Sequence, residues 1–258
     1  MKNTNILIVD EKIDLVEPLG EIFERIGYSV TMVEDGDKAI GLLKRRNFDI
    51  LLTPSRLPGA SGAWDYKIMK RLCPSMAVII VNSVREKKET AEILESEIEA
   101  VVDKPFNVKK LMETVDSVLK APLILIVDHR LQDRQALKNM LAEGGYRALV
   151  AKDARKAMEM VRESDFDIVI LDVGVEGTDG VEVIEAVKKI KPDIEVIMMI
   201  DYSTVRRVED LLRKGAYTCL YKPFLDTEKL IRVIEEMRSQ SIRAGSQYKR
   251  ETGRREGE

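Results

Sequence analysis

The chain has 258 residues, of which 45% are hydrophobic and 34% are charged, and its formal net charge at pH 7 is −3. This charge balance gives no electrostatic reason to expect binding to nucleic acid or to an anionic membrane. The longest apolar runs are as short as strands, so we expect no membrane span and no signal peptide. The two cysteines show no metal-binding or redox spacing, which favours the reducing cytoplasm.

Short apolar runs alternate with amphipathic stretches along the chain. This alternation is typical of a parallel β-sheet that is covered by helices on both faces. Each half of the chain reads as five strands and five helices, a (βα)5 unit of the α/β class. We expect strands at residues 5–10, 29–33, 50–53, 78–82 and 100–102, and again at residues 123–128, 148–151, 168–172, 196–200 and 219–221.

The second half of the sequence repeats the first after a shift of 118 residues, without a gap. Residues 6–10 return as residues 124–128, and residues 104–106 return as residues 222–224. The repeat predicts two domains, at residues 4–120 and 122–238, with a linker too short for independent tumbling. The periodicity stops near residue 239, so residues 239–258 are predicted to be a disordered polar tail.

Charged residues follow several of the predicted strands in the second copy. Asp128, Asp172 and Lys222 come at the ends of its first, third and fifth strands. In an open parallel sheet, ligands bind at this edge, outside the carboxyl ends of the strands. Two carboxylates and a lysine suit a divalent cation together with a phosphoryl group, whereas the plainer interpretation is an ion-pair cluster.

These motifs resemble the receiver domain of bacterial two-component response regulators. The resemblance rests on Ile-Leu-Ile-Val-Asp-Glu at residues 6–11, on Phe-Asp-Ile-Val-Ile-Leu-Asp at residues 166–172 followed by Gly177 and Gly180, and on Tyr-Lys-Pro-Phe at residues 221–224. It covers about residues 4–238, with the motifs in the expected order and spacing. It implies two tandem flavodoxin-like receiver domains, each a five-stranded parallel sheet with helices on both faces.

The resemblance also assigns roles in the second copy. Asp172 would be the phosphoacceptor, phosphorylated by a histidine kinase or a phosphotransfer protein. Lys222 would bind the phosphoryl group. Asp128, Asp172 and the backbone carbonyl of Gly174 would hold Mg²⁺.

The second copy departs from the family pattern at three positions. His129 stands where a second acid belongs, and imidazole is a poor ligand for magnesium. Ile200 replaces the hydroxyl residue after the fourth strand, and Ser203 and Thr204 lie too far along the loop to substitute for it. Cys219 replaces the aromatic residue of the fifth strand. We therefore expect weak Mg²⁺ binding and an unusual response to phosphorylation.

The first copy is predicted to be a degenerate pseudo-receiver. It keeps the acids Asp10 and Glu11 and the lysine Lys104, but Pro54 occupies the phosphoacceptor position. Asn82 replaces the hydroxyl residue after the fourth strand. We expect this copy to serve as a scaffold for binding or dimerisation.

Three classes of function remain open from the sequence. The first is a phosphorylated signalling receiver, and the second is a phosphorylation-independent interaction or dimerisation module. The third is an enzyme, either a flavodoxin-like FMN protein or a phosphatase with an aspartate nucleophile. Residues 13–15 and 130–133 are apolar or charged rather than the Ser/Thr/Gly-rich loop that FMN needs, and neither copy has a second acid two residues after the first-strand aspartate. We therefore expect no enzyme, and an output that acts through a downstream protein partner, with a homodimer left open.

Overall fold

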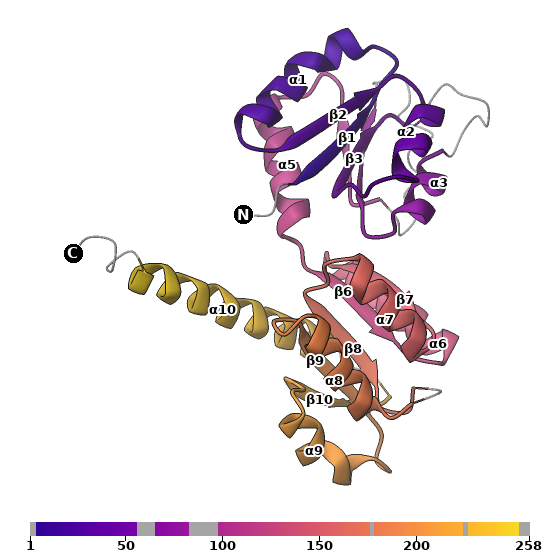
Figure 1. Ribbon diagram of the computed structural model, residues 1–258, viewed down its shortest axis with the longest axis vertical. Coiled ribbons are helices and arrows are strands. Elements are labelled where there is room, and N and C mark those ends of the chain that lie inside the picture. The colour runs from indigo at the N-terminus through magenta and orange to yellow at the C-terminus, as the bar shows by residue number, and fades with distance from the viewer. Residues whose placement is uncertain (1–3, 56–64, 83–97, 176–177, 224–226, 253–258) are drawn as a thin grey trace. The chain divides into compact units, whose positions relative to one another are not determined.

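The computed structural model describes residues 4–55, 65–82, 98–175, 178–223 and 227–252 (Figure 1). The chain divides into two compact units, Met1–Pro122 and Leu123–Glu258. None of the helices within the described ranges is long and apolar enough to cross a membrane.

The first unit is built on a five-stranded parallel sheet in the order β2-β1-β3-β4-β5. This is the strand order of the flavodoxin-like fold, so the predicted fold class is confirmed for this unit. Its described elements are β1 (Asn5–Val9), α1 (Ile13–Arg25), β2 (Ser29–Val33), α2 (Gly36–Leu43), β3 (Ile50–Thr53), α3 (Asp65–Leu72), β4 (Ala77–Asn82), β5 (Ala100–Asp103) and α5 (Val108–Lys120).

The second unit repeats this sheet, with the order β7-β6-β8-β9-β10 and all strands parallel. The predicted fold class is therefore confirmed here too. Its elements are β6 (Leu123–Val127), α6 (Leu131–Glu143), β7 (Arg147–Ala151), α7 (Ala154–Glu163), β8 (Ile168–Asp172), α8 (Gly180–Ile190), β9 (Glu195–Ile200), a 3-10 turn at Val205–Arg207, α9 (Val208–Arg213), β10 (Thr218–Tyr221) and α10 (Thr227–Thr252).

Helices cover both faces of the first sheet, α1 and α5 on one side and α2 and α3 on the other (Figure 1). The apolar runs of the strands explain this arrangement, because successive residues of a strand point to opposite faces. Ile50 and Leu52 pack with side chains of α1 and α5. Leu51 packs with side chains of α2 and α3 instead.

The same alternation in β8 fixes the side on which Asp172 lies. Ile168 and Ile170 belong to the core formed with α6 and α10. Val169 and Leu171 belong to the core formed with α7 and α8. Asp172 continues the first set, so its carboxylate emerges at the carboxyl end of the sheet on the side of α6 and α10.

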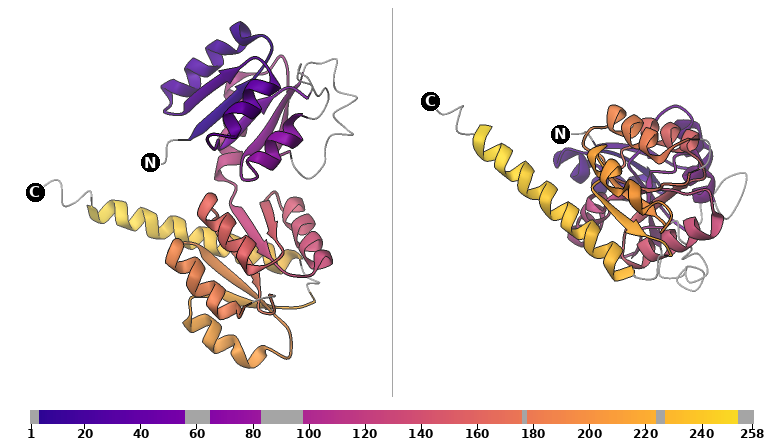
Figure 2. Two further views of the ribbon diagram at one scale, coloured as in Figure 1. Left: turned by 45° about the vertical axis from the view of Figure 1, so that its right-hand side comes forward. Right: turned by 90° about the horizontal axis from the view of Figure 1, so that it is seen from below.

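The predicted disordered tail at residues 239–258 is wrong for residues 239–252, because α10 runs without interruption from Thr227 to Thr252. The helix extends beyond the sheet of its own unit (Figure 2). This segment has no proline, and about half of its residues (two glutamines, two arginines, one alanine, one lysine and one glutamate) favour helix, whereas its glycine and three serines do not. Residues 253–258 lie outside the described residues.

Candidate functional site

The second unit brings three charged side chains together at the carboxyl edge of its sheet. Asp128 follows β6, Asp172 ends β8 and Lys222 follows β10. They are only 1%, 5% and 9% exposed, respectively. Because buried charges are costly unless they are paired, this burial requires close contact among the three groups.

Lys222 lies between the two carboxylates. Its Nζ is 2.5 Å from Oδ2 of Asp128 and 2.9 Å from Oδ1 of Asp172. Burial by itself would lower the pKa of Lys222, but the hydrogen bonds and charges of the two aspartates outweigh it and raise this pKa above its usual 10.5. The lysine is therefore charged at neutral pH and is positioned to meet an anionic group at Asp172.

His129 lies near the other oxygen of each of the same two acids. Its Nδ1 lies 3.3 Å from Oδ2 of Asp172 and 3.7 Å from Oδ1 of Asp128. One ligand atom from each of these three residues falls within 4.8 Å of the others. The donor set fits Mg²⁺ poorly, because this hard ion prefers oxygen ligands and one of the three donors is a nitrogen.

Gly174 passes close to the same carboxylate. A Cβ atom at this position would lie 3.6 Å from Oδ2 of Asp172. The backbone of Gly174 is thus near the Asp172 carboxylate, and the role of its carbonyl as a metal ligand stays a prediction. Gly177, which the sequence motif includes, lies outside the described residues.

Three side chains at the start of α6 also contribute to the site, and the sequence interpretation missed them. Oδ2 of Asp133 lies 3.4 Å from Nζ of Lys222, and Arg130 pairs with Asp133 at 2.7 Å. Arg134 donates a hydrogen bond of 2.6 Å to the backbone carbonyl of Asp128. The signal for them was their position in the first turn of the helix that follows the first strand, which points back toward the strand ends.

The second unit carries no hydroxyl side chain at the end of its fourth strand, β9, where the receiver pattern has one. Ile200, at the end of β9, is fully buried in the core formed with α7 and α8. The hydroxyls of Ser203 and Thr204 both bond to Oδ1 of Asp201, at 2.6 and 3.0 Å, and both residues lie on an exposed turn. Cys219 lies in β10, where burial raises the pKa of its thiol.

In the first unit, Asp10 and Lys104 reproduce only part of this arrangement. Nζ of Lys104 lies 2.6 Å from Oδ2 of Asp10. Pro54 follows β3 and supplies no carboxylate. Glu11 is exposed, and within the described ranges no group of three potential metal ligands occurs in this unit.

Asn82 has a second role in the first unit that the sequence did not reveal. This fully buried side chain accepts a hydrogen bond of 3.2 Å from the backbone N–H of Ser55. It therefore ties the end of β4 to the residue that follows Pro54. The hydroxyl of Ser55 is itself buried, with no hydrogen-bond partner among the described residues.

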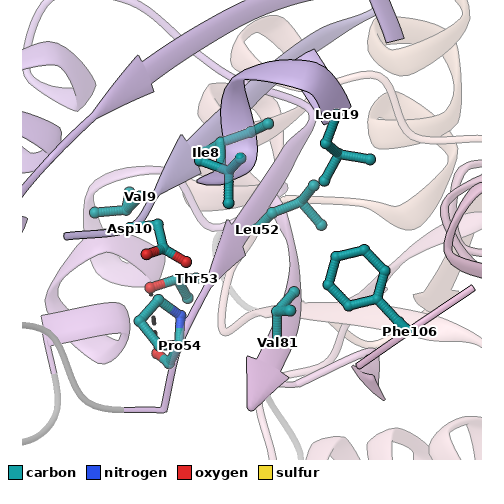
Figure 3. Close-up of a pocket in the computed structure, with 10 residues that line it drawn as sticks. Ile8, Val9, Asp10, Leu19, Leu52, Thr53, Pro54, Val81 and Phe106 are labelled. Atoms are coloured by element: carbon teal, nitrogen blue, oxygen red, sulfur yellow. Dashed lines mark hydrogen bonds between the residues drawn. The ribbon is translucent and has the colours of Figure 1, made fainter. Parts of the chain in front are cut away.

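A small pocket opens beside the degenerate position (Figure 3). The Asp10 carboxylate, Thr53 and Pro54 lie together at one end of it, and apolar side chains line the rest (Figure 3). Its free volume of about 10 Å³ is close to the space that a single water molecule needs, so it has no room for a substrate. The apolar lining consists of Ile8, Val9, Val16, Leu19, Leu52, Val81 and Phe106.

Individual relatives cover different shares of the chain. A response regulator receiver protein of Anaeromyxobacter sp. (strain Fw109-5) is 25% identical over 233 residues, which cover 90% of this chain and 94% of that protein. Sporulation initiation phosphotransferase F of Bacillus subtilis is 33% identical over 101 residues, covering 39% of this chain and 82% of that protein. Transcriptional regulatory protein ZraR of Klebsiella oxytoca is 36% identical over 113 residues, which cover 44% of this chain and 25% of that protein. The matched segment thus spans about a quarter of the length of ZraR.

A solved structure and a family model extend the comparison. Chemotaxis response regulator CheY4 of Vibrio cholerae is 26% identical, with 46% of this chain and 99% of that chain covered and a TM-score of 0.42. The family model of the response regulator receiver domain matches this sequence twice, at residues 6–116 and 124–235. The chain therefore belongs to the response regulator receiver domain family of two-component signalling and carries two copies of that domain.

Proposed function

We propose that the second unit accepts a phosphoryl group on Asp172 from a histidine kinase or a phosphotransfer protein. The observation that supports this role is the buried contact of 2.9 Å between Asp172 and Lys222, with Asp128 on the other side of the lysine. Phosphorylation of an aspartate is general in this family. Here Asp172 is the acid at the end of the third strand, beside a second acid and a lysine.

The proposed transfer needs few groups. A carboxylate oxygen of Asp172 attacks the phosphorus of the donor and forms an acyl phosphate. The bond from phosphorus to the donor atom breaks, and its electron pair leaves with the donor. Lys222 would then exchange one carboxylate contact for a phosphoryl oxygen, so that its positive charge offsets the added negative charge.

Receiver domains generally bind Mg²⁺ at their acidic pocket, where the cation neutralises phosphoryl charge. We propose that Asp128, Asp172 and the Gly174 carbonyl would hold this ion weakly in the second unit. The reason is that His129 removes one of the negative charges that would offset the cost of dehydrating Mg²⁺.

The response to phosphorylation would also be unusual. Ile200 offers no hydroxyl to follow the phosphoryl group, and Ser203 and Thr204 are committed to Asp201. We therefore propose an output through a downstream protein partner, and no turnover reaction of the chain's own. A cytoplasmic location is part of the proposal, and the free thiols of Cys73 and Cys219 are consistent with it.

The first unit would act as a pseudo-receiver scaffold. Its lysine is already paired with Asp10, and Pro54 offers nothing to phosphorylate. The bond between Asn82 and the Ser55 backbone holds together two strand ends that would otherwise be free to respond to a phosphoryl group.

A second candidate function is a phosphorylation-independent interaction or dimerisation module made of two degenerate receivers. His129 and Ile200 favour it, because they remove a metal ligand and the switch hydroxyl from the more complete unit. On this view, Asp172 would be a structural partner of Lys222 and would never carry a phosphoryl group.

Intact-mass analysis separates the two candidates. The full chain is incubated with acetyl phosphate and a high concentration of magnesium, and we expect an adduct of one phosphoryl mass. Asp172→Asn should abolish the adduct, whereas Glu11→Gln, which changes an exposed acid of the first unit, should leave it intact. Absence of any adduct, or a phosphorylated peptide from residues 45–62, would contradict the proposal and favour the interaction module.

A further inference from the structure

We infer that Asp128, His129 and Asp172 form a site that prefers a first-row transition ion such as Zn²⁺ to Mg²⁺. We call these three residues the Asp–His–Asp cluster. The inference deepens the proposed function, since it concerns the ion that would accompany phosphorylation of Asp172. Metal selectivity can nevertheless be measured without any phosphoryl transfer.

The four carboxylate oxygens of the cluster fall into two pairs. Oδ2 of Asp128 and Oδ1 of Asp172 contact the ammonium group of Lys222. The other oxygens, Oδ1 of Asp128 and Oδ2 of Asp172, are the ones nearest to His129, and Oδ1 of Asp128 also accepts a hydrogen bond of 2.8 Å from the backbone N–H of Arg130. Two carboxylate oxygens and one imidazole nitrogen thus lie close to each other, and these are not the oxygens nearest to the lysine.

The spacing of these three atoms suits a small metal ion. Nδ1 lies 3.3 Å from one carboxylate oxygen and 3.7 Å from the other. Two ligands that each lie about 2.1 Å from a tetrahedral zinc ion are themselves about 3.4 Å apart. The imidazole and the two acids therefore need only small movements to share one ion.

The imidazole nitrogen faces the Asp172 carboxylate without forming a hydrogen bond to it. Nδ1 of His129 is buried and has no hydrogen-bond partner among the described residues. A buried polar atom without a partner costs about 1–3 kcal/mol. Coordination of a cation would give this atom a partner. If His129 were only a polar residue of the loop, its ring could turn so that the nitrogen faced water.

The identity of the donors determines which ion is preferred. Mg²⁺ demands oxygen ligands and gives up its water reluctantly, so a nitrogen donor contributes little to its binding. Imidazole and carboxylate together suit Zn²⁺ and its neighbours in the first transition row. The first unit offers a comparison within the same chain. Pro54 lies beside Asp10 there, at the repeat position of Asp172, and supplies no ligand atom from its side chain (Figure 3).

His129 is the only histidine of the chain, which makes the experiment direct. Full-length, ¹⁵N-labelled protein without a histidine tag is stripped with a chelator, and its imidazole nitrogens are followed by NMR during titration with ZnCl₂ or MgCl₂. We expect a large shift of the Nδ1 signal with zinc, saturating at one ion per chain, and little change with magnesium. An imidazole spectrum that is unchanged at zinc saturation would overturn the inference, because it would place the zinc elsewhere, for example on a cysteine.

Calorimetry on matched variants measures the selectivity. His129→Ala should weaken zinc binding by at least about tenfold, which is the lower end of the loss seen when even an outer partner of a metal ligand is removed. His129→Asp should shift the preference toward magnesium. Leu131→Ala, which changes an exposed neighbour, should leave both affinities unchanged.

Equal zinc affinities in the wild type and in folded His129→Ala would refute the inference. Circular dichroism of each variant checks that it is folded. These titrations contain no phosphodonor, so a lack of phosphorylation at Asp172 would refute the proposed function and leave the metal preference to be judged on its own.

Discussion

Replacing Lys222 by methionine tests how strongly the second unit depends on the charge at its centre. Lys222→Met keeps the length of the side chain but removes the ammonium group between Asp128 and Asp172. The two acids are 1% and 5% exposed, so the variant leaves two negative charges buried side by side. Breaking a buried ion pair by removing one partner costs about 3–5 kcal/mol, and we expect a loss of about 3 kcal/mol in the free energy of unfolding.

The first unit supplies a matched control at the repeat position. Lys104 pairs with one acid only, and its side chain is 34% exposed, compared with 8% for Lys222. An ion pair that solvent reaches contributes about 0–1 kcal/mol, so Lys104→Met should cost no more than about 1 kcal/mol. Burial and the number of partners, rather than the lysine itself, would account for the difference between the two variants.

Urea unfolding of the full chain, followed by two probes in the presence of a chelator, measures both effects. Trp64, the only tryptophan, belongs to the first unit, so its fluorescence reports on that unit, and circular dichroism reports on both. Equal losses in Lys222→Met and Lys104→Met would refute the reasoning. So would a loss below about 1 kcal/mol in Lys222→Met, the value typical of an exposed pair.

The pH dependence of this effect has a defined sign. Because the pKa of Lys222 is raised in the folded state, its stabilising contribution is complete below the ordinary lysine value of 10.5 and is lost only as the pH rises through the higher, folded value. The difference between wild type and Lys222→Met should therefore stay constant from neutral to mildly alkaline pH.

Two further substitutions test the degenerate site and a structural acid. Pro54→Asp would restore a carboxylate beside Asp10, and it should create a magnesium site in the first unit that calorimetry and Trp64 fluorescence detect; no response would show that the pocket has changed beyond one residue. The placement of Trp64 itself lies outside the described residues. Burial raises the pKa of Asp167, and the hydrogen bond from the backbone of Leu123 offsets this effect only in part. At a pH above the raised pKa, the charged carboxylate therefore lowers the stability of the folded state. Asp167→Asn should therefore be better tolerated, relative to wild type, at neutral pH than in acid below the ordinary aspartate value of 3.8, and a difference in the opposite direction in urea unfolding would contradict this sign.

The strands and the central site residues could be predicted because their physical signals are local. Strands buried on both faces must be apolar runs, and Ile50–Thr53 and Ile168–Asp172 have the predicted bounds. A parallel sheet then brings the residues that follow its strands to one edge. Asp128, Asp172 and Lys222 meet there for that reason.

Other features depend on side-chain directions that the sequence does not specify. Asp133 joins the site only because the first turn of α6 points back toward Lys222. The bond from the Ser55 backbone to Asn82 links residues that are far apart in sequence and has no repeat motif to indicate it. The continuation of α10 to Thr252 includes a glycine and three serines and shows no apolar periodicity, so neither helix propensity nor an apolar face indicates it in the sequence.

The duplication also separates the acids that hold the fold together from the acids that could react. Asp49 accepts a hydrogen bond of 2.8 Å from the N–H of Asn5, and its repeat partner Asp167 accepts one of 2.7 Å from the N–H of Leu123. Each bond anchors the first residue of the first strand, so each copy would lose a backbone hydrogen bond without its aspartate. The phosphoacceptor position carries no such constraint, because Lys104 in the first unit still has Asp10 as its partner when Pro54 replaces the carboxylate. Both copies therefore keep the lysine at the end of the fifth strand, Lys104 and Lys222, whereas only the second copy keeps the acid at the end of the third strand, Asp172.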